Sequence, residues 1–150
     1  MAIGKTKVDN LLRRVKLLNE VIAWVSTFDA KTKTEILDWI REDQLRAKGE
    51  DADGEVVGYY SLTTELISKG KKKFNTHYTL FDTGDFYRSF YVLVFQSEIY
   101  ISANADKGED NLFEKFGDKI VALNEENYKK LIDKVKNSFI QHARKVLQLD

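Results

Sequence analysis

The sequence predicts an α+β fold, in which amphipathic helices pack on a small antiparallel sheet or hairpin and long helices stand near both ends of the chain. Apolar residues recur every three or four positions in residues 5–28 and again in residues 125–147, which is the spacing of amphipathic helices. Between them, residues 91–95 and 98–102 are rich in β-branched and aromatic residues, as strands are. The sheet is therefore expected in the second half of the chain.

Length and composition predict one soluble domain over residues 1–150. The chain is long enough to bury a core, and its 24 lysines and arginines balance 24 aspartates and glutamates. Binding to nucleic acid or to an anionic membrane therefore needs a local patch. The sequence has no cysteine, which excludes disulfides, thiolate zinc sites and a cysteine nucleophile. Charges interrupt every apolar run, so neither a signal peptide nor a membrane span is expected.

The N-terminal helical part covers about residues 5–48. Its first helix is expected over residues 5–28, with an apolar stripe that packs on the protein's own core in the preferred interpretation and on a partner helix in the alternative. The stripe consists of Val8, Leu11, Leu12, Val15, Leu18, Ile22 and Val25. Thr32 and Glu35 have the spacing of a capping box, so a second helix is expected from there to about Gly49.

Residues 49–58, GEDADGEVVG, are predicted to form a polar turn around Asp53 and Gly54. They resemble a calcium loop only in part. If Gly54 held the sixth position of an EF-hand loop, Gly49 would be first and Tyr60 twelfth, where aspartate and glutamate are required. A plain surface turn is therefore the preferred interpretation.

A basic run follows a short helix that Ser61 is expected to cap. Its residues are Lys69, Lys71, Lys72 and Lys73, and aromatic residues flank them. Lysines beside aromatic rings can meet the phosphates and the bases of a nucleic-acid strand. The plainer interpretation is a solvated loop, and an acidic protein surface is the preferred partner if the patch binds anything.

The strand region is preceded by a turn. Asp82 or Thr83 is expected to cap a short helix there, and Gly84 to supply the backbone freedom that the turn needs. The two strands are expected to join through Gln96 and Ser97.

Three further elements follow the hairpin. Residues 105–109 are expected to form a charged loop, and Asp110 to cap a short helix over residues 111–116 that stops at Gly117. Asn124 is expected to cap the last helix.

No arrangement of catalytic residues stands out. His77 and His142 lie far apart, with no second ligand at metal-binding spacing. Ser61 and Ser89 lack a base or a glycine elbow, and residues 4–6, Gly-Lys-Thr, match only the tail of a phosphate-binding loop. The carboxylate pairs fit helix N-termini. An enzyme is therefore not predicted, and no cofactor or metal is expected.

Residues 80–90, LFDTGDFYRSF, resemble the L-x-x-T-G-x-L-x-x-S-[IF] signature of the tailed-phage virion morphogenesis proteins, also called tail completion or neck proteins. The motif residues are Leu80, Asp82, Thr83, Gly84, Phe86, Arg88, Ser89 and Phe90. In that family a hairpin, a short helix and a segment opening a long C-terminal helix follow. Here residues 92–102, 111–117 and 120–124 stand in those places.

The tail-completion-like part covers about residues 78–148. The sequence is also similar to small virion proteins of crAss-like Bacteroidetes phages, in which GYYS, here residues 58–61, recurs together with the DTGDFY string. Two features depart from the family pattern: the proline-bearing segment common before the last helix is missing, because this chain has no proline, and the two N-terminal helices are longer than in the simplest members.

The resemblance implies a non-enzymatic virion protein of the phage head-to-tail connection, made in the cytoplasm of the bacterial host. Such a protein forms a ring of its own copies between the portal or adaptor and the tail, without a cofactor or a membrane, and meets DNA at most transiently in the channel. The alternative is an intracellular binding module whose lysine and aromatic patch contacts nucleic acid or a protein partner.

A ring built from one kind of chain needs a heterologous interface with two different patches on each copy. The basic run and the polar turn offer one such pair. The acids of the turn are Glu50, Asp51, Asp53 and Glu55. In a ring these acids can face the lysines of the next copy. The alternative is that both loops are exposed and screened by salt.

Overall fold

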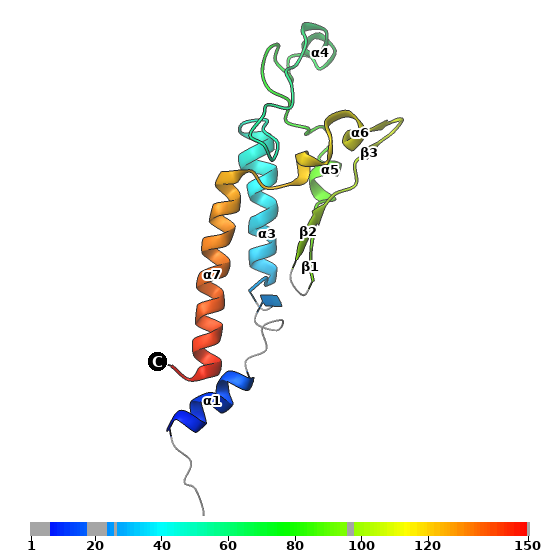
Figure 1. The fold of residues 1–150 in the computed structure, drawn as a ribbon. Coiled ribbons are helices and arrows are strands. Elements are labelled where there is room, and N and C mark those ends of the chain that lie inside the picture. The colour runs from blue at the N-terminus through cyan, green and yellow to red at the C-terminus, as the bar shows by residue number, and fades with distance from the viewer. Residues whose placement is uncertain (1–6, 18–23, 26, 96–97, 150) are drawn as a thin grey trace, which may run out of the picture.

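Two helical stretches form the body of the molecule. The α-helix α3 (Ala30–Asp38) continues into the π-helix η1 (Trp39–Arg46), and both run alongside α7 (Glu125–Leu147) in the opposite direction (Figure 1). The computed structural model describes residues 7–17, 24–25, 27–95 and 98–149. Within these residues, no helix has the length and apolar character needed to cross a membrane. The α+β class predicted from the sequence is confirmed.

Asp29 caps the start of α3. Its carboxylate accepts a hydrogen bond of 2.8 Å from the backbone N–H of Thr32, a donor of the first turn that has no partner within the helix. The same bond lowers the pKa of Asp29. The expected capping box of Thr32 and Glu35 is therefore wrong, because Thr32 already lies inside the helix. Glu35 instead forms an ion pair with Lys134 of α7.

The π-helix η1 carries the second half of this stretch. Its hydrogen bonds span five residues, as between the N–H of Ala47 and the C=O of Glu42 at 2.9 Å. The stretch ends at Arg46, close to the expected stop at Gly49, where φ is +65°. After Gly49 the chain forms a turn that an antiparallel bridge between Glu50 and Val56 closes.

α7 begins at the predicted cap. Asn124 Oδ1 accepts a hydrogen bond of 2.9 Å from the N–H of Asn127. At the other end of α7, Arg14 of α1 (Lys7–Leu17) donates a hydrogen bond of 3.2 Å to the C=O of Leu147. A cation at this position satisfies a free carbonyl and complements the helix dipole. α1 therefore lies against the C-terminal end of α7 (Figure 1).

The predicted hairpin is confirmed. β1 (Tyr91–Val94) pairs antiparallel with β2 (Ile99–Ser102), and Val92 stands opposite Ile101. Val92 is buried and Val94, Ile99 and Ile101 on the same face are partly buried, so this face of the hairpin packs against the body beside α3 (Figure 1). The expected connection through Gln96 and Ser97 lies outside the described residues.

A second, shorter hairpin occupies the region expected as a charged loop. β3 (Asp106–Lys107) pairs with β4 (Asp110–Asn111), although aspartate, lysine and glycine have little strand propensity. The following helix α6 (Leu112–Phe116) is capped by Asn111 and not by Asp110, because Asn111 Oδ1 accepts from the backbone N–H groups of two residues in its first turn. The 3₁₀ helix η2 (Asp118–Val121) then leads to α7.

Gln44 joins these elements through a buried polar network. Its side chain is fully buried, donates to the C=O of Ala122 at 2.9 Å and accepts from the backbone N–H of Asn124 at 2.8 Å. The side-chain amide of Asn127 donates to the same Gln44 oxygen at 2.9 Å. Apolar side chains surround this network, including Ile40, Leu45, Phe86, Phe90, Ile120 and Val121. The start of α7 is thus held to η1 by directed bonds as well as by packing.

α1 does not bury its apolar stripe. Val8, Leu12 and Val15 are exposed, Val8 by 64%, so the expected packing of this stripe on the protein's own core is wrong for the described part of the helix. Leu18 and Ile22 lie outside the described residues. The partner-helix interpretation stays open for α1.

An arm, defined here as residues 59–77, projects from the body and carries α4 (Leu62–Ile67) at its tip (Figure 1). Ser61 caps α4 as predicted, by accepting a hydrogen bond of 3.1 Å from the N–H of Thr64. None of the residues of the arm is buried. The arm is closed at its base by an antiparallel bridge between Tyr59 and His77.

Candidate functional site

The turn before β1 is built on a glycine that a side chain would not fit. Gly84 has φ +87° and holds the N-cap position of α5 (Asp85–Arg88). A Cβ atom there would lie 2.9 Å from Arg88 Nη1 and 3.2 Å from Phe81 Cε2. The left-handed backbone and the crowding together require glycine.

The expected N-cap at Asp82 or Thr83 is therefore wrong. Gly84 occupies that position and has no side chain, although Thr83 Oγ1 accepts a long hydrogen bond of 3.4 Å from the N–H of Asp85, the first residue of α5. Thr83 Oγ1 also donates to the carboxylate of Asp85 at 2.5 Å, and this bond lowers the pKa of Asp85. Asp82 forms ion pairs with distant lysines.

The other motif residues hold the turn against the sheet. Phe86 and Phe90 are buried in the core with ring centroids 5.0 Å apart. Ser89 Oγ donates to the C=O of Phe86 at 2.7 Å and accepts from the N–H of Asn104 at 2.9 Å. Arg88 pairs with Asp85. These contacts hold the turn, while Asp82, Thr83 and Asp85 of the same motif line a small cavity of about 250 Å³ beside β3.

Asp82 joins the arm to the short hairpin. Its carboxylate lies 3.0 Å from Lys107 Nζ and 3.6 Å from Lys72 Nζ. The hydrogen bond from Lys107, followed by the charges of both lysines, lowers the pKa of Asp82. Sequence analysis placed Lys72 in a free basic run, whereas the structure pairs it with a motif residue.

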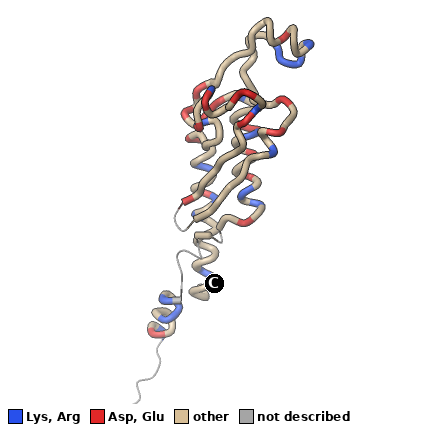
Figure 2. Tube along the Cα trace, turned by 90° about the vertical axis from the view of Figure 1, so that its right-hand side faces the viewer, with Lys and Arg blue, Asp and Glu red and all other residues tan. Residues whose placement is uncertain are grey.

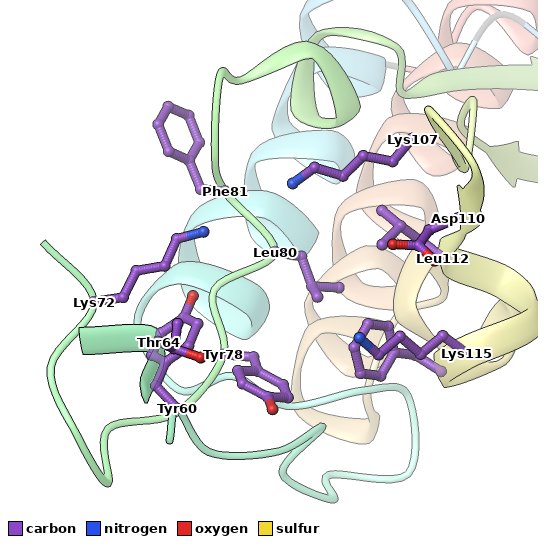
Figure 3. A pocket seen from close by; sticks show the side chains of 11 residues that line it. Tyr60, Thr64, Lys72, Tyr78, Leu80, Phe81, Lys107, Asp110, Leu112 and Lys115 are labelled. Carbon is purple, nitrogen blue, oxygen red and sulfur yellow. The ribbon is translucent and has the colours of Figure 1, made fainter. Parts of the chain in front are cut away.

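A lysine pocket opens beside this ion pair. It has a volume of about 230 Å³, and its residues come from the arm, the segment after it, β3, β4 and α6. In Figure 3 the ends of Lys72 and Lys107 point toward one another on one side of Leu80, and Lys115 lies along the opposite side. The pocket is lined by Tyr60, Thr64, Lys72, Tyr78, Leu80, Phe81, Lys107, Asp110, Leu112, Lys115 and Phe116. Cations therefore border an apolar and aromatic floor.

The predicted basic run also borders a wider groove of about 530 Å³ on the same part of the molecule. Lys71, Lys72 and Lys73 line it together with Arg46 and His77. The guanidinium of Arg46 stacks over the ring of Phe81 at 4.4 Å, so that charge is already engaged. Lys69 is exposed on the arm outside this groove.

In the acidic loop, defined here as residues 50–56, part of the negative charge is already engaged in bonds within the chain. Asp53 pairs with Lys119, and the carboxylate of Asp51 accepts from the backbone N–H groups of Asp53 and Glu55. Within the described residues, Glu50 and Glu55 form no ion pair. Figure 2 shows acidic residues gathered in the loops below the arm, whereas lysines mark the tip.

The described residues contain no group of three metal-ligating side chains. His77 Nε2 lies 2.9 Å from the C=O of Arg46, so this ring helps to hold the base of the arm. Burial raises the pKa of Tyr87, whose hydroxyl donates to the C=O of Thr79 at 2.5 Å. The perturbed tyrosine therefore serves packing in the core.

No protein-family model, curated protein or solved structure matches this chain. The resemblance of residues 80–90 rests on the motif itself.

Sequence reasoning missed three lysines that shape the candidate site. Lys107 and Lys115 line the pocket, and Lys119 neutralises Asp53. Lys107 and Lys119 each lie 25 or more residues along the chain from their acidic partners. Lys115 is at least as far along the chain from the basic run, with which it shares the pocket. No local spacing marks such pairs, because the fold alone brings them together.

Proposed function

We propose that the protein is a non-enzymatic structural subunit of the phage head-to-tail connection, which assembles with its own copies as a ring between the portal or adaptor and the tail. The motif of residues 80–90 supports this proposal through its resemblance to tail completion proteins. In the structure its glycine, serine and aromatic residues hold a turn against a hairpin, which suits a structural role.

The observation that carries the proposal is the exposure of apolar side chains at both ends of an elongated molecule. At one end, Val8, Leu12 and Val15 of α1 are exposed. At the other, Leu66 and Ile67 of α4 are 72% and 78% exposed (Figure 1). Exposed apolar patches mark interaction sites. A connector meets a different neighbour at each end, and these two patches differ in sequence and shape.

The mass of the purified assembly tests the proposal. We expect native mass spectrometry to find a closed oligomer of one defined size, either for the chain alone or after it is added to phage particles that lack it. Cryo-electron microscopy of the complete particle should then place the protein at the neck. A monomer at every concentration, together with its absence from purified particles, would contradict the proposal.

The groove lined by the basic run favours the second candidate, an intracellular module that binds nucleic acid or a protein partner. Lys71, Lys72 and Lys73 lie there beside the rings of Tyr60 and Phe81. Titration of a labelled single-stranded oligonucleotide at two salt concentrations tests this candidate. Binding that weakens steeply with salt, by a chain that stays monomeric, would favour it over the ring.

A further inference from the structure

The lysine pocket has the size of a docking point for a partner's side chains. Its volume of about 230 Å³ is below the roughly 300–1,000 Å³ of small-molecule sites. Leu80, Leu112 and Phe116 form its apolar floor, and Lys72, Lys107 and Lys115 stand at its border (Figure 3). Small pockets of this kind receive the anchor residues of protein interfaces.

The charge balance of the pocket favours one carboxylate. Three lysines and Asp110 line it, and Asp82 at its edge pairs with two of the lysines, so one positive charge stays without a partner. Lys115 supplies that charge: its Nζ lies 5.4 Å from the centre of the Phe116 ring and forms no ion pair in the described part of the chain.

A strand of phosphates fits this surface less well than a carboxylate does. Three exposed acids, Asp106, Glu109 and Glu114, stand on the elements that carry Lys107 and Lys115. They would repel the successive charges of a nucleic-acid backbone, whereas a single carboxylate can approach Lys115 alone. The charge pattern therefore favours an acidic protein segment.

The acidic loop of the same protein has the matching chemistry. Its Glu55 is exposed and has no ion pair among the described residues, and the next residue, Val56, is 38% exposed. A carboxylate beside an apolar side chain thus stands on a turn fixed by two hydrogen bonds to Asp51. This arrangement complements a cation beside an apolar floor.

We infer that the lysine pocket of one copy receives Glu55 and Val56 of the next copy, an interface that rests on the proposed assembly of identical chains. Glu55 meets Lys115, and Val56 covers the apolar floor. The acidic loop follows η1 and is tied to η2 by the ion pair of Asp53 with Lys119, whereas the pocket is lined by the arm, the segment after it, β3, β4 and α6, so the two patches consist of different residues. Two distinct patches are what a closed ring with heterologous contacts requires.

Charge reversal and charge exchange test this interface. We expect Lys115→Glu and Glu55→Lys each to weaken self-association about tenfold or more in sedimentation velocity, and the double variant to recover most of the loss. Lys31→Glu is the matched control, because Lys31 is exposed on α3, far along the chain from both patches. Circular dichroism checks that every variant is folded. Unchanged association of both single variants would overturn the inference.

Peptide binding separates this inference from the proposed function. A peptide of residues 49–58 should bind the purified full-length chain in a fluorescence titration, and the same peptide with Glu55→Lys should bind at least tenfold more weakly. If the wild-type chain is monomeric at every concentration and absent from purified particles, yet binds the peptide, the ring is contradicted and the pocket assignment stands. If a ring forms but neither the peptide nor the reversal has an effect, the pocket assignment is wrong. Tight binding of oligothymidylate that Lys115→Glu abolishes would assign the pocket to nucleic acid instead.

Discussion

Ile40 in the body and Ile67 in the arm are both helical isoleucines, but Ile40 is fully buried whereas Ile67 is 78% exposed. The body encloses its apolar side chains between η1, α7 and the two hairpins. α4 has no buried residue, and it is held by its cap at Ser61 and by local bonds such as that from the N–H of Phe74 to the carboxylate of Glu65. A helix this short is marginal alone, so the arm depends on its caps while the body depends on burial.

The largest difference between the two regions should appear on truncating these isoleucines. Ile40→Ala should lower the free energy of unfolding by about 2–5 kcal/mol, because it leaves a cavity in the packed core. Ile67→Ala should change it by less than about 0.5 kcal/mol. Urea denaturation followed by circular dichroism measures both. Equal losses would mean that the arm belongs to the same cooperative core as the body.

The polar network of the body should be nearly as sensitive. Gln44→Leu keeps the side-chain volume but leaves buried groups of Ala122, Asn124 and Asn127 without a partner, and we expect a loss of about 3 kcal/mol in the free energy of unfolding. Gln141→Leu on the exposed face of α7 is the control and should leave the denaturation midpoint unchanged.

Two glycines with similar backbones sharpen the comparison. Gly84→Val in the body should cost about 1–2 kcal/mol from its positive φ, and more from contact with Phe81. Gly70 in the arm has φ +78° with open space around it, so Gly70→Val should strain only the arm and leave the main thermal transition in place. A Gly84→Val protein that melted like the wild type but lost a binding activity would show that the turn has a direct role in recognition.

Removing one helix cap from the body and one from the arm makes the same comparison, with a smaller expected loss of stability. Asn124→Ala removes the cap of α7 and should lower the free energy of unfolding by about 1 kcal/mol. Ser61→Ala removes the same kind of cap from α4, and we expect local fraying without a change in global unfolding. Amide hydrogen exchange, read residue by residue, distinguishes the two outcomes. A shift of the global midpoint by Ser61→Ala would contradict the separation of arm and body.

The smallest effect concerns the ion pairs that join the arm to β3. Lys107, and then Lys72, lower the pKa of Asp82 below its ordinary value of 3.8. The ion pairs therefore stabilise the fold above about pH 4, and this contribution is lost as the pH falls toward the lowered pKa. Because Asp82 is about half exposed, the effect should be under about 1 kcal/mol. Asp82→Asn should flatten the acid limb of the stability curve, and an unchanged limb would show that the pairs do not stabilise the fold.

The elements set by local patterns were predictable from the sequence. The cap at Asn124, the hairpin of β1 and β2 and the need for glycine at position 84 follow from residue types at fixed spacing. The cap of α3 was missed because two positions have suitable residue types. Thr32 and Glu35 have the spacing of a capping box, whereas Asp29 is the residue that caps the observed helix. Two candidates at neighbouring positions cannot be separated without the tertiary contacts of Glu35.

The candidate site was less predictable than the fold. Asp82 has the residue type of a helix cap, and only its approach to Lys107 makes it an ion-pair partner. β3 and β4 form from residues without strand propensity because the turn between them brings their backbones together. The lysine pocket depends on both, so no local pattern indicates it.

The π-helix η1 makes the buried network depend on the hydrogen-bonding pattern of this segment. In a helix of this kind each hydrogen bond encloses one more residue than in an α-helix. If residues 39–46 returned to the α-helical pattern at their present length, the side chains after the first turn would rotate by about 100°, the angle of one residue. Gln44 would then point away from Asn124, and the start of α7 would lose its anchor. A natural variant with the α-helical pattern here should therefore be one residue shorter in this segment.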